Sequence, residues 1–281
     1  MAAVILWPEF ELVKVDFMDR PIVLVVGHGS RETAANDEFE QLVARYQTRR
    51  PQFELRFGYL ELAQPSLADA LANVGGSEAS VTLLPLFLFA AGHMKNDIPQ
   101  ALAVARRERP GVPFCVARAL GVHRGMVDLA LERAEAVLPL EGDEARRTTV
   151  VMVGRGASDA DANRDFREVV RMFGESRPFR SVLPCFVGIA QPRFEVTLEL
   201  AAKSRPERLL VVPFMLFGGR LVARLEEQVA AIRARYPSIK TVLAGHLGAH
   251  ERLLQVLDER VEEAMAGLAP LPCVNGERTR V

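Results

Sequence analysis

The sequence has few cysteines and no surplus of charge of either sign. Its three cysteines, Cys115, Cys185 and Cys273, lie far apart and form no CxxC pair. This spacing indicates neither a disulfide framework nor a cysteine zinc site, and it is typical of a protein in a reducing cytoplasm. The net charge is −1, from 35 basic and 36 acidic residues. Proteins that bind a phosphate backbone carry a basic surplus, so we expect no nucleic-acid partner.

Long apolar runs are also absent. No stretch reaches the roughly 18 consecutive apolar residues that a membrane span requires, because Pro85 and Pro213 interrupt the longest candidates. Residues 1–8 lack the basic segment of a signal peptide, and their apolar run is too short for one. We therefore expect a cytoplasmic protein with no membrane partner.

The sequence does contain a long internal repeat. Val26-Gly27-His28-Gly29 returns as Val153-Gly154-Arg155-Gly156, an offset of 127 residues (155 − 28). A period of this length indicates a duplicated domain, because solenoid repeats have periods of about 20–50 residues. The other matching positions are Asn36 and Phe39 with Asn163 and Phe166, Ala63-Gln64-Pro65 with Ala190-Gln191-Pro192, Leu120-Gly121 and His123 with Leu247-Gly248 and His250, and, after one inserted residue, Pro85 and Phe89 with Pro213 and Phe217.

Each half of the repeat alternates short β-rich runs with longer segments of helical periodicity. Such alternation predicts an α/β fold of two duplicated lobes, each a parallel four-stranded sheet with helices on both faces. The expected strands are 22–26, 53–60, 81–85 and 113–116 in the first half and 149–153, 181–187, 208–212 and 241–243 in the second; the expected helices of the first half are 36–49, 66–73, 97–109 and 124–138.

The same pattern divides the chain into domains. We expect an N-terminal extension at 1–20, a first lobe at 21–138, a polar linker at 139–147, a second lobe at 148–267 and a disordered tail at 268–281. Because one chain holds both lobes, we expect a monomer in which they form an internal pseudo-dimer.

Three side chains of the first half are expected at one edge of its sheet. His28 follows the first strand, Glu61 ends the second, and His93 lies in the loop after the third. Ligands of open parallel sheets bind beyond the carboxyl ends of the strands, so these side chains can meet. Two imidazoles and a carboxylate can bind a divalent metal, and they can also accept protons near neutral pH.

The second half lacks these side chains. Its equivalent residues are Arg155, Gly188 and Leu221, the last of which follows Arg220. A carboxylate at the end of a strand, such as Glu61, can be an ordinary solvated residue, but its replacement by Gly188 favours a function. The pattern therefore predicts chemistry in the first half and a scaffold, or the opposite wall of a cleft, in the second.

Three motifs follow one another in the first half. They are Gly27-His28-Gly29-Ser30-Arg31, Leu60-Glu61-Leu62-Ala63-Gln64-Pro65-Ser66, and Pro85-Leu86-Phe87-Leu88-Phe89-Ala90-Ala91-Gly92-His93 with Asp97-Ile98-Pro99. In this order they resemble the sirohydrochlorin chelatases of the CbiX/SirB type, and the resemblance spans residues 21–266. It implies ATP-independent insertion of Co(II) or Fe(II) into sirohydrochlorin, with the macrocycle in the cleft between the lobes. It also implies that His28 and His93 are metal ligands and proton acceptors, assisted by Glu61.

The metal of such a lyase is a substrate, so we expect no permanently bound cofactor. Cobalt in cobalamin biosynthesis is the first expectation, and iron in siroheme biosynthesis is the alternative. Nickel has the same ligand preferences, so the residues do not separate the three metals. The chain also lacks the tail rich in histidine or cysteine that some long forms carry, so no iron–sulfur cluster is indicated.

Four further residues are candidates for substrate binding. Arg155 and Arg220 stand at or beside positions where histidines were lost, and an arginine pairs well with a carboxylate arm of sirohydrochlorin. Arg31 can bind an anion, and Phe89 belongs to an apolar loop that suits a macrocycle face. Each also has a structural interpretation, because surface arginines are usually solvated and Phe89 recurs as Phe217, as a core residue would.

Two other functions fit these residues less well than a chelatase does. A phosphohistidine phosphatase would need an arginine directly before the histidine, where this chain has Gly27. A tetrapyrrole or metal carrier would not need proton acceptors, which His28, Glu61 and His93 supply together. His123 and His250 recur in both halves just before a helix, and this position favours a capping or packing role.

Overall fold

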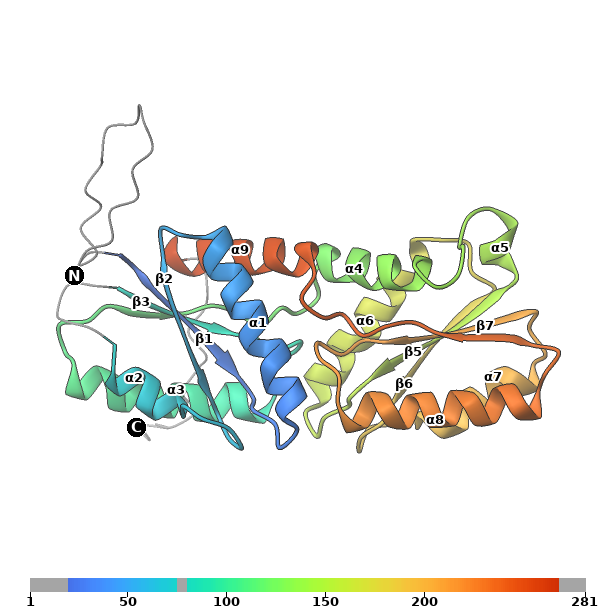
Figure 1. Cartoon of the computed structure of the whole chain (residues 1–281), viewed down its shortest axis with the longest axis horizontal. Coiled ribbons are helices and arrows are strands. Elements are labelled where there is room, and N and C mark those ends of the chain that lie inside the picture. The colour runs from blue at the N-terminus through green and yellow to red at the C-terminus, as the bar shows by residue number, and fades with distance from the viewer. Residues whose placement is uncertain (1–19, 75–79, 268–281) are drawn as a thin grey trace, which may run out of the picture.

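The structure, a computed structural model, describes residues 20–74 and 80–267. The expected tail at 268–281 and all but the last residue of the expected extension lie outside the described residues. Each half contributes one sheet and the helices that follow its strands (Figure 1). The elements are β1 (Ile22–Gly27), α1 (Thr33–Arg49), β2 (Glu54–Tyr59), α2 (Leu67–Ala72), β3 (Val81–Pro85), α3 (Gly92–Glu108), β4 (Phe114–Val116), α4 (Arg124–Glu135), α5 (Asp143–Arg146), β5 (Thr148–Gly154), α6 (Ala160–Glu175), β6 (Ser181–Phe186), α7 (Phe194–Lys203), β7 (Arg208–Pro213), α8 (Arg220–Arg235), β8 (Lys240–Leu243) and α9 (Glu251–Met265).

The two sheets confirm the predicted fold class. Both have four parallel strands, in the orders β2-β1-β3-β4 and β6-β5-β7-β8. The register repeats as well, because Gly27 pairs with Tyr59 at the end of β1 and Gly154 pairs with Phe186 at the end of β5. Duplication has therefore preserved the topology and the strand alignment along with the sequence motifs.

Helices cover both faces of each sheet, which explains why the central strands β1, β3, β5 and β7 are buried along their whole length. In β1, Val23 and Val25 point to one face and pack with α1, whereas Ile22, Leu24 and Val26 point to the other and pack with α2 and α3. The first of these faces belongs to a core that continues into the second half through β5, α4, α6 and α9. The two sheets therefore share one hydrophobic core and are not independent bodies.

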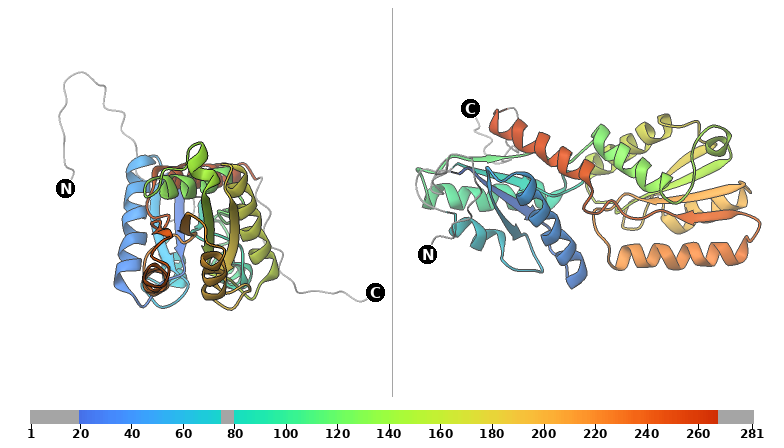
Figure 2. Two further views of the ribbon diagram at one scale, coloured as in Figure 1. Left: turned by 90° about the vertical axis from the view of Figure 1, so that its right-hand side faces the viewer. Right: turned by 45° about the horizontal axis from the view of Figure 1, so that its top comes forward.

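The last helix of each half lies over the sheet of the other half. Helix α9 packs on β3 and β4, and α4 packs on β7 and α6; Figure 1 and the right-hand view of Figure 2 show this exchange. We define the first lobe as the first sheet with α1, α2, α3 and α9, and the second lobe as the second sheet with α4, α6, α7 and α8. The residues 139–147 therefore separate the halves of the repeat, but they do not separate the packed lobes.

Equivalent side chains hold the exchanged helices in place. Arg133 of α4 donates to the carbonyl of Leu247 at 2.6 Å, and Arg260 of α9 donates to the carbonyl of Leu120 at 2.7 Å. Both pairs keep the repeat offset, since 260 − 133 and 247 − 120 are both 127. The exchange is thus reciprocal and is built from the same residues on both sides.

The segment between the halves is packed and not an open linker. It contains the short helix α5, and Leu140 and Ala145 are buried. Arg208 donates to the carbonyl of Pro139 at 2.8 Å and pairs with Glu144, which ties the segment to the second sheet. The polar residues in the sequence led to the prediction of a linker, but the two apolar residues anchor it.

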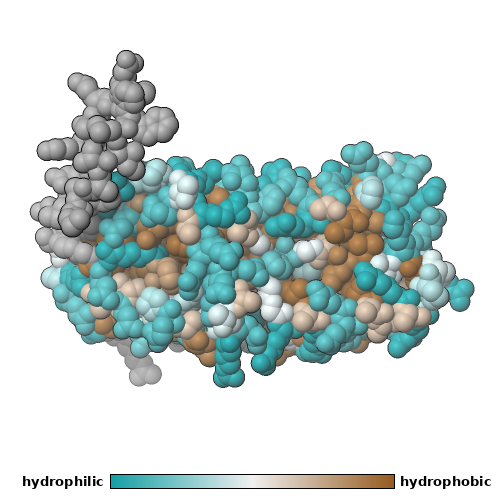
Figure 3. Space-filling model, in the orientation of Figure 1, coloured by the Kyte–Doolittle hydropathy of each residue, from teal (hydrophilic) through white to brown (hydrophobic). Residues whose placement is uncertain are grey.

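Hydrophilic residues predominate on the face shown in Figure 3, and hydrophobic residues gather in patches between the helices. Within the ranges that the structure describes, no helix combines the length and apolar character that crossing a membrane would need.

Candidate functional site

His28 lies directly after β1, at the carboxyl edge of the first sheet, as predicted. Its main-chain carbonyl accepts from the main-chain N–H of Glu61 at 3.0 Å, so the loops after β1 and β2 are joined at this point. Between them Gly29 has φ +87°, and a Cβ there would stand 1.8 Å from the carbonyl oxygen of Glu61. Only glycine allows both this conformation and this approach, which explains the glycine after His28.

The side chains of His28 and Glu61 meet, as the sequence predicts. Nδ1 of His28 lies 3.4 Å from Oε1 of Glu61 and 3.2 Å from the carbonyl oxygen of Gly29. Both neighbours are acceptors, which favours the neutral tautomer that carries its proton on Nδ1. The edge of the Phe87 ring, 6.4 Å away between centroids, packs against the imidazole. His28 is 23% exposed and Glu61 43%, so the pair remains accessible.

A hydrogen-bonded brace fixes the loop that follows His28. The side chain of Asn36 accepts from the N–H of Ser30 at 2.9 Å and donates to its carbonyl at the same distance. Asn163 makes the same two bonds to Ala157 in the second half, at 3.0 and 2.7 Å. The repeated asparagines therefore hold the loop shape in both halves, whether or not a histidine is present.

His93 is placed differently from the prediction. It is the second residue of α3, which begins at Gly92, and not part of a preceding loop. The helix therefore starts five residues earlier than the expected Asp97, because the sequence pattern did not reveal the turn formed by Gly92–Asn96. The backbone position of His93 is still at the carboxyl edge of the first sheet; its side chain lies outside the described residues.

The equivalent edge of the second sheet carries an unpaired cation. Arg155 follows β5, is exposed, and has no side-chain hydrogen bond or ion pair within the described part of the chain. Opposite it, a Cβ on Gly188 would lie 2.4 Å from the carbonyl oxygen of Arg155. The loss of the acidic residue at position 188 thus has a structural reason, because the main chains pack too closely there for any side chain.

The other predicted arginines lie near the junction of the lobes. Arg31 is exposed and, among the described residues, its side chain has no charged or hydrogen-bonding partner. Arg220, the first residue of α8, is 84% exposed and pairs with Glu32 of the first half, with 2.7 Å between Nε and Oε1. A cation that the sequence interpretation missed, Lys95 of α3, pairs with Asp159 of the second half at 2.5 Å.

Phe89 packs between the lobes, as its structural interpretation expects. Its ring stacks on Phe214 at 6.0 Å and meets Phe166 edge-on at 6.3 Å, both of the second half. Phe217 makes the reciprocal contact with Phe39 at 6.3 Å. Phe89 is partly buried against the shared core, and its contact with substrate stays a prediction. Leu62 and Ile189 are exposed apolar residues at the edges, at 51% and 70% exposure.

The remaining histidines are structural. Nδ1 of His123 accepts from the N–H of Gly125 and caps α4, and Nδ1 of His250 accepts from the N–H of Arg252 and caps α9. Their Nε2 atoms face acids of the exchanged helices. These are Glu259 of α9 for His123, at 2.8 Å, and Glu132 of α4 for His250, at 3.4 Å. The expected capping role is confirmed for both. His246 pairs with Glu38 at 3.5 Å across the junction of the lobes.

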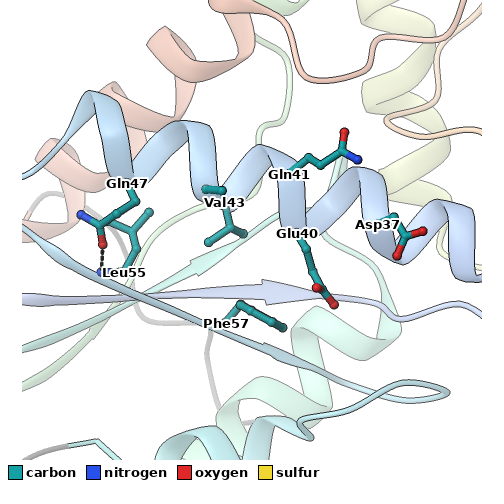
Figure 4. A pocket seen from close by; sticks show the side chains of 8 residues that line it. Asp37, Glu40, Gln41, Val43, Gln47, Leu55 and Phe57 are labelled. Carbon is teal, nitrogen blue, oxygen red and sulfur yellow. Dashed lines mark hydrogen bonds between the residues drawn. The ribbon is translucent and has the colours of Figure 1, made fainter.

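A groove of about 590 Å³ runs between α1 and the edge strand β2, and Figure 4 shows the residues that line it. Its floor is apolar, with Leu55 and Phe57, and one end is acidic, with Asp37 and Glu40. The side chain of Gln47 bonds to the main chain of β2 and accepts from the N–H of Leu55 at 2.9 Å. Neither His28 nor Glu61 lines this groove, so it is separate from the candidate site.

The described geometry fits metal and proton chemistry at the edge of the first sheet. It presents the imidazole of His28, the carboxylate of Glu61 beside it, and the start of the helix that carries a second histidine. Among the described side chains, no group of three or more histidine, cysteine, aspartate or glutamate residues is placed to hold a metal ion, at this edge or elsewhere. The second sheet offers an arginine at the matching edge, which fits an anion.

Comparisons with known proteins agree with this description. The family model CbiX matches the chain twice, over residues 22–137 and 149–264. A sirohydrochlorin cobaltochelatase of Priestia megaterium is 31% identical over 252 residues, which cover 89% of this chain and 82% of that protein. A sirohydrochlorin ferrochelatase of the same organism is 28% identical over 254 residues, with 90% and 93% covered. The structure of SirB from Bacillus subtilis with Fe³⁺ superposes with a TM-score of 0.78 at 26% identity, covering 88% of this chain and 96% of that one.

Proposed function

The chain belongs to the CbiX family, and from this premise we propose that it is a sirohydrochlorin chelatase that inserts cobalt(II) without ATP. Insertion replaces two pyrrole N–H protons of the macrocycle with one divalent metal ion, so the enzyme must hold the metal and accept protons. The family relatives include a cobaltochelatase and a ferrochelatase of similar identity. Iron(II) is therefore the alternative metal, and the assay below separates the two.

In the proposed mechanism the first half holds the metal. The acceptors around Nδ1 of His28 favour the tautomer in which Nε2 is the nitrogen that binds metal. Glu61 stabilises the positive charge that His28 takes on when it binds metal or accepts a proton. The resemblance assigns the second imidazole to His93, whose place at the start of α3 puts it at the same edge of the sheet. Each imidazole that releases its bond to the metal can then accept one of the two pyrrole protons at that nitrogen and pass it to solvent.

In the same proposal the second half binds the macrocycle. Sirohydrochlorin carries many carboxylates, and Arg155, Arg220 and Arg31 offer guanidinium groups near the junction of the lobes. Arg155 and Arg31 are free to pair with them, because neither has a side-chain partner among the described residues. Because one chain supplies both walls, the enzyme acts as a monomer.

The observation that carries this proposal is the His28–Glu61 pair at 3.4 Å in one half and its absence, with Arg155 in its place, in the other. The test is to mix purified protein with sirohydrochlorin and either Co²⁺ or Fe²⁺, without ATP and under anaerobic conditions. Absorbance follows formation of the metallated product. Faster insertion of cobalt supports the proposal, and faster insertion of iron assigns the alternative metal. Binding of sirohydrochlorin without insertion of either metal would make the protein a carrier.

A further inference from the structure

Two ion pairs cross between the halves near the candidate site. In one, Nζ of Lys95 lies 2.5 Å from Oδ2 of Asp159, with Asp161 at 3.7 Å. In the other, Nε of Arg220 lies 2.7 Å from Oε1 of Glu32. The cation of each pair belongs to the helix that follows the third strand of its sheet, and the acid belongs to the other half.

The acids occupy the same position in the repeat, since 32 + 127 = 159. Glu32 directly precedes α1 and Asp159 directly precedes α6, so both stand at the N-cap of the helix that follows the central strand. The cations are near-equivalent, because Arg220 is the first residue of α8 and Lys95 is the fourth of α3. An ion pair between the halves therefore occurs at corresponding places in both halves, with different residues each time.

These pairs can exchange partners at low cost. Lys95 is 41% exposed and Arg220 is 84% exposed, so water competes for both cations. Exposed ion pairs contribute little net stability, and a new anion of suitable geometry can replace the old one.

Both cations also lie close to where the substrate would bind. Lys95 is two residues after His93 in the first turn of α3, and Arg220 directly precedes the residue that aligns with His93. A carboxylated macrocycle between the halves would thus bring anions near both of them. The acids beside the cations are then competitors of the substrate.

We propose that Lys95 and Arg220 are substrate-binding residues that rest on Asp159 and Glu32 of the opposite half and transfer to carboxylates of the macrocycle when it enters. The inference rests on the proposed function for the identity of the macrocycle. It adds a specific consequence, namely that the two members of each pair affect substrate binding in opposite directions.

The experiment compares the members of each pair by titrating metal-free sirohydrochlorin into the full-length protein and following absorbance. Lys95→Gln and Arg220→Gln should each raise Kd about threefold to tenfold, because one charged contact is lost. Asp159→Asn and Glu32→Gln should each lower Kd about twofold to fivefold, because a competing anion is removed. Asparagine is a good N-cap, so Asp159→Asn preserves the bonds to the N–H groups of Asp161 and Ala162.

Lys203→Gln is the matched control, because Lys203 pairs at 3.7 Å with Glu199 of its own helix. It changes the net charge by −1, as Lys95→Gln and Arg220→Gln do, and should leave Kd unchanged. Weaker binding in both the cation and the acid variants would overturn the inference, since a purely structural pair loses the same contact from either side. Equal binding in all variants would also overturn it. Opposite shifts without metal insertion would support the inference while refuting the proposed activity, and no binding by the wild type would refute both.

Discussion

Replacing Gly29 by alanine should impair metal insertion far more than it impairs folding. The added Cβ would stand 1.8 Å from the carbonyl oxygen of Glu61, and an ordinary contact of 3.4 Å requires a shift of 1.6 Å (3.4 − 1.8). That shift moves the loop of Glu61 away from His28. A misplacement of about 1 Å at a reacting centre costs on the order of a hundredfold in rate, so we expect a loss of that size in kcat.

Gly156→Ala is the matched control, because Gly156 is the repeat of Gly29 and has φ +79°. Both variants place an alanine in the left-handed region, which lowers the free energy of unfolding by about 1–2 kcal/mol. In a chain of this size the melting temperature should fall by about 2–8 °C. Gly29→Ala should lose somewhat more stability, because its clash is with the main chain.

The assay is steady-state insertion followed by absorbance, alongside thermal melting of each variant. Similar kcat in Gly29→Ala and Gly156→Ala, with both folded, would refute the argument that the close approach of these loops sets the catalytic geometry. If Gly29→Ala does not fold, Glu61→Gln tests the same pair without a steric change. It should slow insertion about tenfold, as loss of a partner that orients a metal ligand commonly does.

Two further predictions concern the second half and the exchanged helices. Arg155→Ala should raise the KM for sirohydrochlorin about threefold to tenfold and leave kcat nearly unchanged, because an exposed arginine binds substrate and transition state equally well. An unchanged KM would show that Arg155 is a solvated surface residue that does not contact the substrate. Burial, with the charge of Arg133, lowers the pKa of His250 in the folded protein. The contribution of neutral His250 to the free energy of unfolding is therefore complete above the unfolded-state pKa of about 6.5, and it is lost as the pH falls below that value. The cap-preserving variant His250→Asn should therefore lose less melting temperature than the wild type between pH 7 and 5, and equal losses would contradict this assignment.

Much of the architecture could be predicted from the sequence, because its signals are local. Strand and helix periodicity, with the 127-residue offset, predicted both sheets and placed His28 and Glu61 at one edge. The rule that ligands bind at the carboxyl ends of parallel strands was enough to predict that these two side chains lie close together. Their contact at 3.4 Å confirms that part of the reasoning.

The features that were missed depend on tertiary packing. Helices α4 and α9 have apolar faces that fit either sheet, so their periodicity could not show that they exchange. The recurrence of Phe89 as Phe217 indicated a core residue, but only the packed structure shows that its partner is Phe214 of the other half. Lys95 belongs to no sequence motif, and it became a candidate only through its hydrogen bond to Asp159, which lies 64 residues away in the sequence.

The most direct test of the account compares kcat for metal insertion in His28→Ala and Arg155→Ala, the two equivalent positions of the repeat, at saturating sirohydrochlorin. We expect His28→Ala to lose about a hundredfold or more in kcat while remaining folded, because a metal ligand and proton acceptor is gone. We expect Arg155→Ala to keep a kcat close to that of the wild type. A folded His28→Ala protein with wild-type kcat, or an equal loss in both variants, would contradict the assignment of catalysis to the first half.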